Sequence, residues 1–177
     1  MSEARPAPAP VIRRATGPDA ARIVALRDEA ARWLLGRGIE QWHPGQVSEA
    51  DVVGWLATGR MYVAEDASGS TGERVVGCVR VAWDDEHVWG RRTPDAGYVQ
   101  ALVTARSDRL RGLGRGLLAH AEDVIARSGR PLARLSCLRG NAGLESFYAE
   151  AGYEEVGWRS FDQPGWDPVT LREKRLS

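Results

Sequence analysis

Cysteine and lysine are scarce in this chain. There are two cysteines, Cys78 and Cys137, each alone inside a strand-like run. Two isolated thiols provide neither a disulfide framework nor a metal-ligand cluster, so we expect small buried side chains in a reducing compartment. Lysine occurs once, at Lys174. No lysine therefore follows a glycine-rich segment in the way that a phosphate-binding loop of the Walker type requires.

Net charge and long apolar runs are also absent. The 24 basic residues balance 24 acidic residues, which gives no electrostatic reason to expect a nucleic acid or an anionic membrane as partner. No apolar run approaches the roughly 20 residues of a membrane-spanning helix. Residues 1–10 are rich in alanine and proline and lack the apolar core of a signal peptide. We expect them to form a disordered tail on a cytoplasmic protein.

The remaining residues, 11–177, are sufficient for a single domain, because the chain is 43% hydrophobic and shows no internal repeat. Apolar runs predict strands at residues 11–14, 61–65, 74–83, 97–104, 132–138, 153–158 and 169–174. Helical spacing predicts helices at residues 16–36, 48–57, 117–128 and 141–152, the first two opened by capping boxes at Thr16 and Ser48. This order indicates an α/β fold with a mixed central sheet: antiparallel N-terminal strands, a βαβ unit and a closing antiparallel strand pair.

The segment Arg111–Gly116 is the most informative stretch of the chain. Three glycines alternate with other residues and run directly into Leu117, the first apolar residue of a helix. Glycine lets the backbone turn tightly and approach a ligand closely. The free N–H groups at the start of a helix favour an anion such as phosphate. Strand, glycine loop and helix together predict a diphosphate site, although a flexible loop that merely begins a helix is the simpler alternative.

The residues that follow add a second pattern. The motif R-x-x-G-x-G at Arg111–Gly116 is followed by the strand Leu135–Leu138, by Asn141 and by Phe147–Tyr153. This order resembles the GNAT family of acyl-CoA-dependent N-acyltransferases, most clearly over residues 98–158. The resemblance implies a single GNAT-like domain whose βαβ unit binds acyl-CoA. Residues 104–110 make a longer lead into the glycine loop than is usual in that family.

The resemblance also implies roles for individual residues. Acetyl-CoA would be the co-substrate, bound at Leu102, Val103, Thr104, Arg109, Arg111, Gly112, Leu113, Gly114, Arg115, Gly116, Asn141 and Tyr148. A backbone N–H near Leu102 would donate to the developing oxyanion, and Tyr148 would be the general acid toward the departing thiolate. Packing alone for Tyr148 and helix capping alone for Asn141 are the simpler alternatives.

The acceptor side is less well defined. The resemblance places it at the helix–turn–helix region that contains the connector of residues 37–45. The candidates for substrate contact are Trp42, His43, Tyr98 and Gln100, with Glu40 as a candidate general base. Trp42 could equally fasten two helices together, and Glu40 and His43 could be surface or capping residues. A water chain past Tyr98 and Gln100 is an equally good proton acceptor.

We therefore predict an N-acetyltransferase that moves an acetyl group from acetyl-CoA to a primary amine of a small molecule or peptide by direct attack. No metal ion is expected. The alternative is a non-catalytic acyl-CoA-binding sensor or regulatory module, and the presence of Tyr148 favours the enzyme. In the polar loop of residues 84–95, Arg91 and Arg92 beside Trp89 could recognise a carboxylate or simply be solvated. Pairing of an exposed strand would allow a homodimer, which the sequence leaves open.

Overall fold

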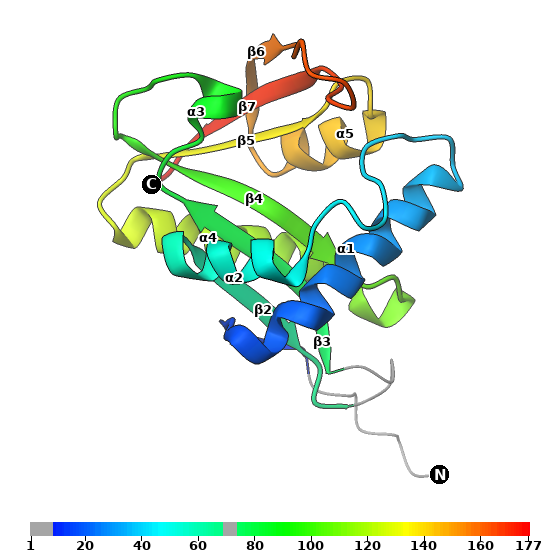
Figure 1. Ribbon diagram of the computed structural model, residues 1–177. Coiled ribbons are helices and arrows are strands. Elements are labelled where there is room, and N and C mark those ends of the chain that lie inside the picture. Colours follow the sequence, from blue (N-terminus) through cyan, green and yellow to red (C-terminus); the bar gives the residue numbers. More distant parts are fainter. Residues whose placement is uncertain (1–8, 69–73) are drawn as a thin grey trace.

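A mixed sheet of seven strands forms the centre of the computed structural model, which describes residues 9–68 and 74–177 (Figure 1). The strands are β1 (Val11–Arg14), β2 (Arg60–Glu65), β3 (Val75–Ala82), β4 (Ala96–Thr104), β5 (Leu132–Leu138), β6 (Glu154–Arg159) and β7 (Val169–Arg175). Their order in the sheet is β1-β2-β3-β4-β5-β7-β6, and β4 and β5 are the parallel pair. The other neighbours are antiparallel, so the α/β fold expected from the sequence is confirmed.

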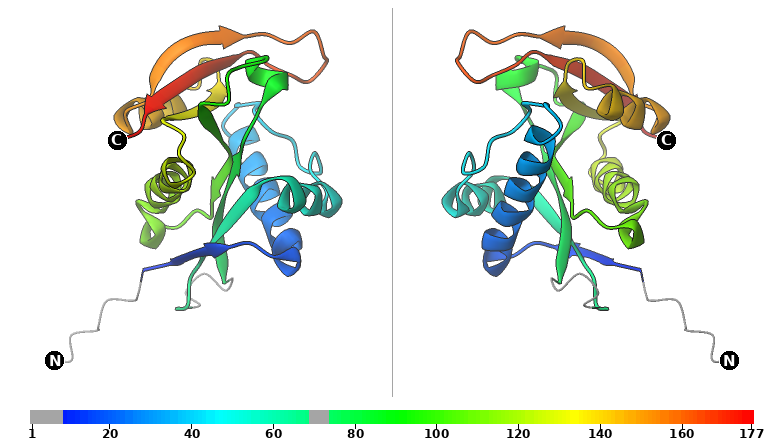
Figure 2. Two further views of the ribbon diagram at one scale, coloured as in Figure 1. Left: turned by 90° about the vertical axis from the view of Figure 1, so that its left-hand side faces the viewer. Right: turned by 90° about the vertical axis from the view of Figure 1, so that its right-hand side faces the viewer.

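Helices cover both faces of this sheet. They are α1 (Ala20–Leu35), α2 (Glu49–Thr58), the short α3 (Glu86–Trp89), α4 (Leu113–Arg127) and α5 (Ala142–Glu150). Two short 3-10 helices, η1 (Gly17–Asp19) and η2 (Asp108–Leu110), precede α1 and α4. Figure 2 shows α1 and α2 on one face of the sheet and α4 and α5 on the other.

The helices on the first face begin where the capping patterns predict. The Ser48 hydroxyl accepts a hydrogen bond from the Asp51 N–H at 3.2 Å, and the Asp51 carboxylate accepts one from the Ser48 N–H at 2.8 Å. At the other start, the Asp19 carboxylate accepts from the Thr16 N–H at 2.8 Å. These side chains satisfy N–H groups that the first helical turn leaves without a partner. Both predicted capping boxes are confirmed, with the turn of η1 inserted before α1.

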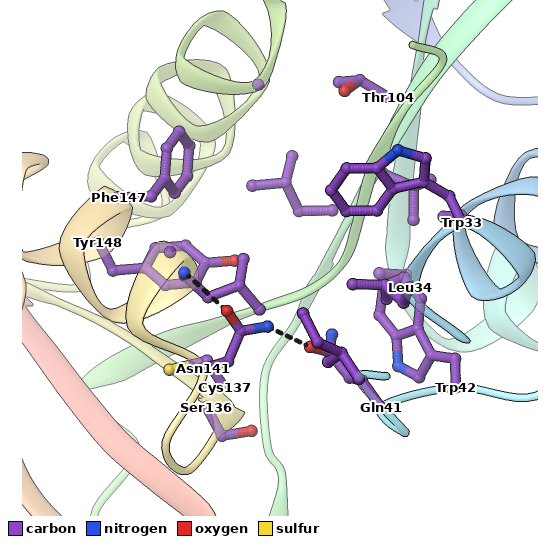
Figure 3. A pocket seen from close by; sticks show the side chains of 18 of the residues that line it. Trp33, Leu34, Gln41, Trp42, Thr104, Ser136, Cys137, Asn141, Phe147 and Tyr148 are labelled. Atoms are coloured by element: carbon purple, nitrogen blue, oxygen red, sulfur yellow. Dashed lines mark hydrogen bonds between the residues drawn. The ribbon is translucent and has the colours of Figure 1, made fainter. Parts of the chain in front are cut away.

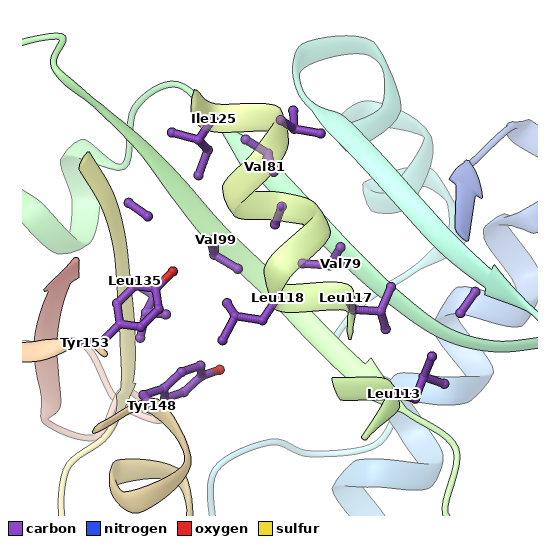
Figure 4. Packing of buried hydrophobic residues seen from close by; sticks show 14 of the residues in the cluster. Val79, Val81, Val99, Leu113, Leu117, Leu118, Ile125, Leu135, Tyr148 and Tyr153 are labelled. Atoms are coloured by element: carbon purple, nitrogen blue, oxygen red, sulfur yellow. The ribbon is translucent and has the colours of Figure 1, made fainter. Parts of the chain in front are cut away.

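Helix α4 supplies most of the core on the second face. Its apolar stripe is fully or almost fully buried against β3, β4 and β5, as Figure 4 shows; the stripe consists of Leu113, Leu117, Leu118, Ala121, Val124 and Ile125. The helix lies close to β4 because Gly97 has no side chain. An ideal Cβ on Gly97 would stand 2.4 Å from Cγ1 of Ile125. The position of α4, and hence of its N-terminus, is therefore set by contact with the backbone of β4.

Some boundaries differ from the sequence prediction. Helix α4 begins at Leu113, so Gly114 and Gly116 lie in its first turn and not in a loop. The loop of residues 84–95 contains the short helix α3, because Val88 and Trp89 are apolar enough to be buried. The predicted tail falls mostly on residues 1–8, and part of the loop between β2 and β3 falls on residues 69–73. Both lie outside the described residues.

We predict that Gly97→Ala lowers the free energy of unfolding by about 1–3 kcal/mol, because the added methyl forces α4 away from β4. The matched control is Gly54→Ala on α2, where nothing lies within 4 Å of an ideal Cβ. There alanine should stabilise the helix by up to about 1 kcal/mol. Urea unfolding of both variants measures the two effects. Equal stability of Gly97→Ala and the wild type would contradict the packing argument.

Candidate active site

The two parallel strands separate soon after they meet. β4 and β5 pair only at Ala96–Tyr98 with Leu132–Arg134. Beyond that point β5 keeps β7 as its partner over its whole length, and β4 keeps β3. The edge of β4 from Val99 to Thr104 that faces β5 therefore carries backbone N–H and C=O groups with no strand partner on that side.

A bulge in β4 lies inside this gap. Gln100 faces Arg80 and Val103 faces Cys78, so Ala101 and Leu102 lie together opposite a single residue of β3. Ala101 has φ +49°, in the left-handed region, and its carbonyl accepts a hydrogen bond from the Cys78 thiol at 3.4 Å. Such a bulge turns the backbone and is common next to functional sites. It redirects the peptide groups around Ala101 and Leu102 within the gap.

A cavity of about 540 Å³ occupies the gap (Figure 3). One side is formed by α1 and the connector to α2, with Ala30, Trp33, Leu34, Arg37, Ile39, Gln41 and Trp42. The floor is residues 99–104 of β4, and the opposite side comes from β5 and α5, with Ser136, Cys137, Asn141, Gly143, Leu144, Phe147 and Tyr148. Gly114 and Arg106 complete the lining. None of these lining residues is aspartate, glutamate or histidine.

Tyr148 projects from α5 into this cavity, and Figure 3 shows its ring beside Asn141 and Phe147. The side chain is 8% exposed and packs edge-on against Phe147 and Tyr153. Burial raises the pKa of the Tyr148 hydroxyl above its ordinary value. The phenol is therefore protonated throughout the neutral pH range and can donate a proton or a hydrogen bond.

Asn141 joins two sides of the cavity. Its side-chain oxygen accepts from the Leu144 N–H at 3.2 Å, which caps α5 as predicted. Its side-chain nitrogen donates to Gln41 Oε1 at 3.2 Å (Figure 3). The connector after α1 is thus tied to the start of α5 across the cavity. The sequence prediction did not include Gln41, whose neighbours Glu40 and Trp42 carried the more specific chemistry.

The glycine segment forms the N-terminus of α4. Gly112 is the N-cap with φ +83°, and no side chain caps the helix there. The N–H groups of Leu113, Gly114 and Arg115 belong to the first turn, which has no intrahelical acceptor for them. The Gly116 N–H already donates to the Gly112 carbonyl at 3.0 Å. Gly114 is the member of this segment that lines the cavity.

The arginines near the glycine segment are each paired with an acid. Arg109 binds Asp66, which is fully buried, and so fastens the lead into α4 to the end of β2. Arg115 pairs with Glu150 of α5 at 3.0 Å. Arg111 reaches Asp108 at 3.2 Å, with both side chains more than four-fifths exposed. An exposed pair of this kind is weak, so Arg111 is the arginine most easily turned toward a ligand.

The structure divides the predicted acceptor residues into two groups. Trp42 and Gln100 line the cavity. Tyr98 is 4% exposed and packs outside the lining, where its hydroxyl accepts a hydrogen bond from Arg134 at 3.3 Å. Glu40 and His43 lie in the connector but are not part of the lining. Ile39, Gln41 and Trp42 of the same connector do line the cavity, so Glu40 is left outside between lining residues.

Several lining residues were not predicted from the sequence, among them Trp33, Arg37 and Arg106. Trp33 has the helical spacing of a core residue, and no local pattern distinguishes a ring in a core from one at a cavity.

The arginines of the loop at residues 84–95 do not line the cavity and have other partners. Arg91 pairs with Glu86 at 3.5 Å, and Arg92 donates to the Trp89 carbonyl at 3.2 Å.

The described residues contain no cluster of three or more histidine, cysteine or acidic side chains able to hold a metal ion. Within the same residues, no helix combines the length and the apolar character needed to cross a membrane. Cys78 and Cys137 are both buried and free, as predicted.

A family model, a curated relative and solved structures that resemble this chain are all acetyltransferases. Residues 57–155 match the family model described as an acetyltransferase (GNAT) domain. A curated relative, the uncharacterized N-acetyltransferase YesJ of Bacillus subtilis, is 29% identical over 143 residues, which is 78% of each chain. The ribosomal-protein-alanine N-acetyltransferase of Brucella melitensis superposes with a TM-score of 0.69 at 22% identity, covering 94% of this chain and 99% of that one. The PaiA N-acetyltransferase of Thermoplasma acidophilum, solved with coenzyme A, gives 0.70 at 18% identity with the same coverage.

We predict that Asn141→Ala lowers the free energy of unfolding by about 1 kcal/mol through loss of the cap on α5. Asn141→Ser keeps a capping oxygen and should remain near wild-type stability, while losing the bond to Gln41. Calorimetric titration of coenzyme A then tests the second role. Reduced affinity in both variants indicates a ligand contact by the amide, whereas unchanged affinity in both leaves Asn141 as a cap alone.

Proposed function

Because this chain belongs to the GNAT acetyltransferase family of acyl-CoA-dependent N-acyltransferases, we propose that it transfers the acetyl group of acetyl-CoA to a primary amine of a small molecule or peptide by direct attack. The observation that carries the proposal is the gap between β4 and β5, because it contains a cavity that reaches from the N-terminus of α4 to Tyr148. We assign the activity to residues 11–177 and place the protein in the cytoplasm.

The residues of the gap fit acetyl-CoA. The edge of β4 at Val99–Thr104 has no strand partner on the side of β5. It can therefore form hydrogen bonds with the amide groups of a pantetheine arm, in the way that it would pair with an additional strand. The uncapped N-terminus of α4 offers first-turn N–H groups and the positive end of a helix dipole to a diphosphate. An ideal Cβ on Gly112 or Gly116 meets nothing within 4 Å, so this terminus is open to a ligand.

The bulge and Tyr148 would stabilise different groups during the acyl transfer. As the amine attacks, negative charge grows on the carbonyl oxygen of the thioester. A backbone N–H near Leu102, redirected by the bulge at Ala101, would stabilise that charge. Tyr148, kept protonated by its burial, would then donate its proton to the departing thiolate.

Direct attack is supported by the state of the only thiol that lines the cavity. Cys137 is 5% exposed, and burial raises its pKa. A protonated thiol is a poor nucleophile, so an acetylated cysteine intermediate is disfavoured. The acetyl group then passes directly from the thioester to the amine, without an acyl-enzyme intermediate.

The acceptor amine must lose a proton, and no carboxylate or imidazole lines the cavity to take it. Glu40 and His43 remain candidates from the connector if it moves inward. A second route starts at Gln100, whose side chain lines the cavity and accepts from Arg80 at 2.8 Å. Burial raises the pKa of Asp85, and the amide of Gln100 offsets part of that shift. Water along Gln100 would carry the proton toward Asp85.

We predict that Gly114→Val weakens acetyl-CoA binding at least about tenfold, because its branched side chain enters the cavity beside the α4 N-terminus. The fold should survive, since an ideal Cβ at Gly114 stands 3.6 Å from Phe147, an ordinary contact. The control is Gly54→Val, at a glycine of α2 outside the cavity where nothing lies within 4 Å of an ideal Cβ. Unchanged affinity of folded Gly114→Val in a calorimetric titration would remove this terminus from the cofactor site.

We predict that Tyr148→Phe lowers turnover by about 10²–10⁴-fold while acetyl-CoA affinity stays unchanged. Thiol release from acetyl-CoA with a panel of amines measures it and tests the proposed function at the same time. Tyr153→Phe is the matched control, because Tyr153 is buried beside Tyr148 but does not line the cavity. Since burial raises the pKa of Tyr148, the wild-type rate should show no decline due to this group up to its ordinary pKa of about 10. Full turnover of Tyr148→Phe would exclude the general-acid role.

A further inference from the structure

Elements from both faces of the sheet line the cavity, and the two faces contribute different chemistry. The N-terminus of α4, where the proposed diphosphate site lies, belongs to the face covered by α4 and α5 (Figure 2). Trp33, Arg37 and Trp42 belong to α1 and its connector, on the opposite face. A donor bound from the first face leaves the second face to the acceptor. We therefore expect the residues of α1 and its connector to contact the acceptor.

Two guanidinium groups lie on one tryptophan at this second face. Arg37 lies 4.1 Å and Arg106 3.1 Å from the ring centroid of Trp33, and all three residues line the cavity. Stacking on the ring fixes the planar groups in place while leaving their N–H donors at the edges. Among the described residues, neither arginine takes part in an ion pair, in contrast to Arg109 and Arg115 near the glycine segment.

Several positive charges lie close together on this face. Partial burial lowers the pKa of Arg106, and the charge of Arg37 lowers it further. On the same face Arg27 is stacked on Trp42 at 4.3 Å, and its buried Nε has no hydrogen-bond partner among the described residues. The lining of the cavity contains no carboxylate that would offset this positive charge. An anion would relieve the repulsion, and a second cation would increase it.

We propose that the acceptor is an amine that also carries an oxyanion such as a carboxylate, and that Arg37 and Arg106 bind this oxyanion at the second face. The proposal rests on the acetyl transfer proposed above and names the substrate class of that site. A fork of N–H donors on each guanidinium matches the two oxygens of a carboxylate. The same lining has no carboxylate to pair with an ammonium group, so polyamines and other purely cationic amines are disfavoured as acceptors.

The kinetic test compares amines of matched shape and different charge. Amino acids, the corresponding amides, in which a neutral carboxamide replaces the carboxylate, and the diamine putrescine are offered to the wild type, to Arg37→Gln/Arg106→Gln and to Arg32→Gln. Arg32 is an exposed arginine of α1 outside the lining, and so controls for loss of surface charge. We expect the wild type to prefer an acid over its amide. In the double variant the KM for that acid should rise by roughly 10- to 100-fold, with no change for the amide or for acetyl-CoA.

Two results would overturn the proposal. One is a wild type that acetylates amides or putrescine as well as any amino acid. The other is a double variant whose KM rises for acetyl-CoA, which would assign the arginines to the donor. Acetylation of amines without preference for acids contradicts the anion site and leaves the proposed function intact.

If no amine is acetylated, a binding measurement still tests the anion site separately from the proposed acetyl transfer. N-acetylated amino acids and their uncharged amides are titrated calorimetrically into protein saturated with coenzyme A. Binding of the acid that depends on Arg37 and Arg106, without acetylation of any amine, supports the anion site and contradicts the proposed function. Absence of any difference between acid and amide contradicts the anion site.

Discussion

The site depends on how the backbone hydrogen bonds of the sheet are shared. β4 is held by β3 on one side and β5 by β7 on the other, so each keeps a complete partner when the two separate. Their short common ladder, Ala96–Tyr98 with Leu132–Arg134, fixes the apex of the gap. Gly97 within that ladder lets α4 approach closely and sets the position of its N-terminus. The same few residues therefore position the free strand edge and the helix terminus.

The chemistry of the cavity follows from which side chains are desolvated there. Tyr148 and Cys137 are both buried, and burial raises both pKa values, so each is present as a neutral donor. The raised pKa keeps the Tyr148 phenol protonated, so it can act as an acid, and keeps the Cys137 thiol protonated, so it is a poor nucleophile. The positive charges of Arg37 and Arg106 remain on the face where an acceptor would enter. One cavity can thus combine an acid for the leaving group with an attraction for anions.

Much of the fold could be predicted from local sequence, because its signals act over a few residues. Helical spacing and the capping pattern at Ser48 predicted α2, and Asn141 was identified as the N-cap of α5. The parallel pairing of β4 and β5 followed from the helix that connects them. The glycine segment marked the N-terminus of α4 but not its first residue, since Gly114 and Gly116 are tolerated in a first turn that tertiary contacts hold.

The sequence by itself determined the α/β architecture, the capped starts of α2 and α5 and the position of the glycine segment before α4, because periodicity, caps and turns are properties of neighbouring residues. Only the tertiary structure decided which arginines are paired with an acid and which can bind a ligand. Arg109 is bound to Asp66, 43 residues away, whereas Arg106, three positions earlier, lies on Trp33 and pairs with no acid in the part of the chain that the structure describes. It also decided that Gln41, and not Glu40, reaches Asn141 across the cavity. Such choices depend on contacts between segments far apart in the chain, and no local pattern encodes them.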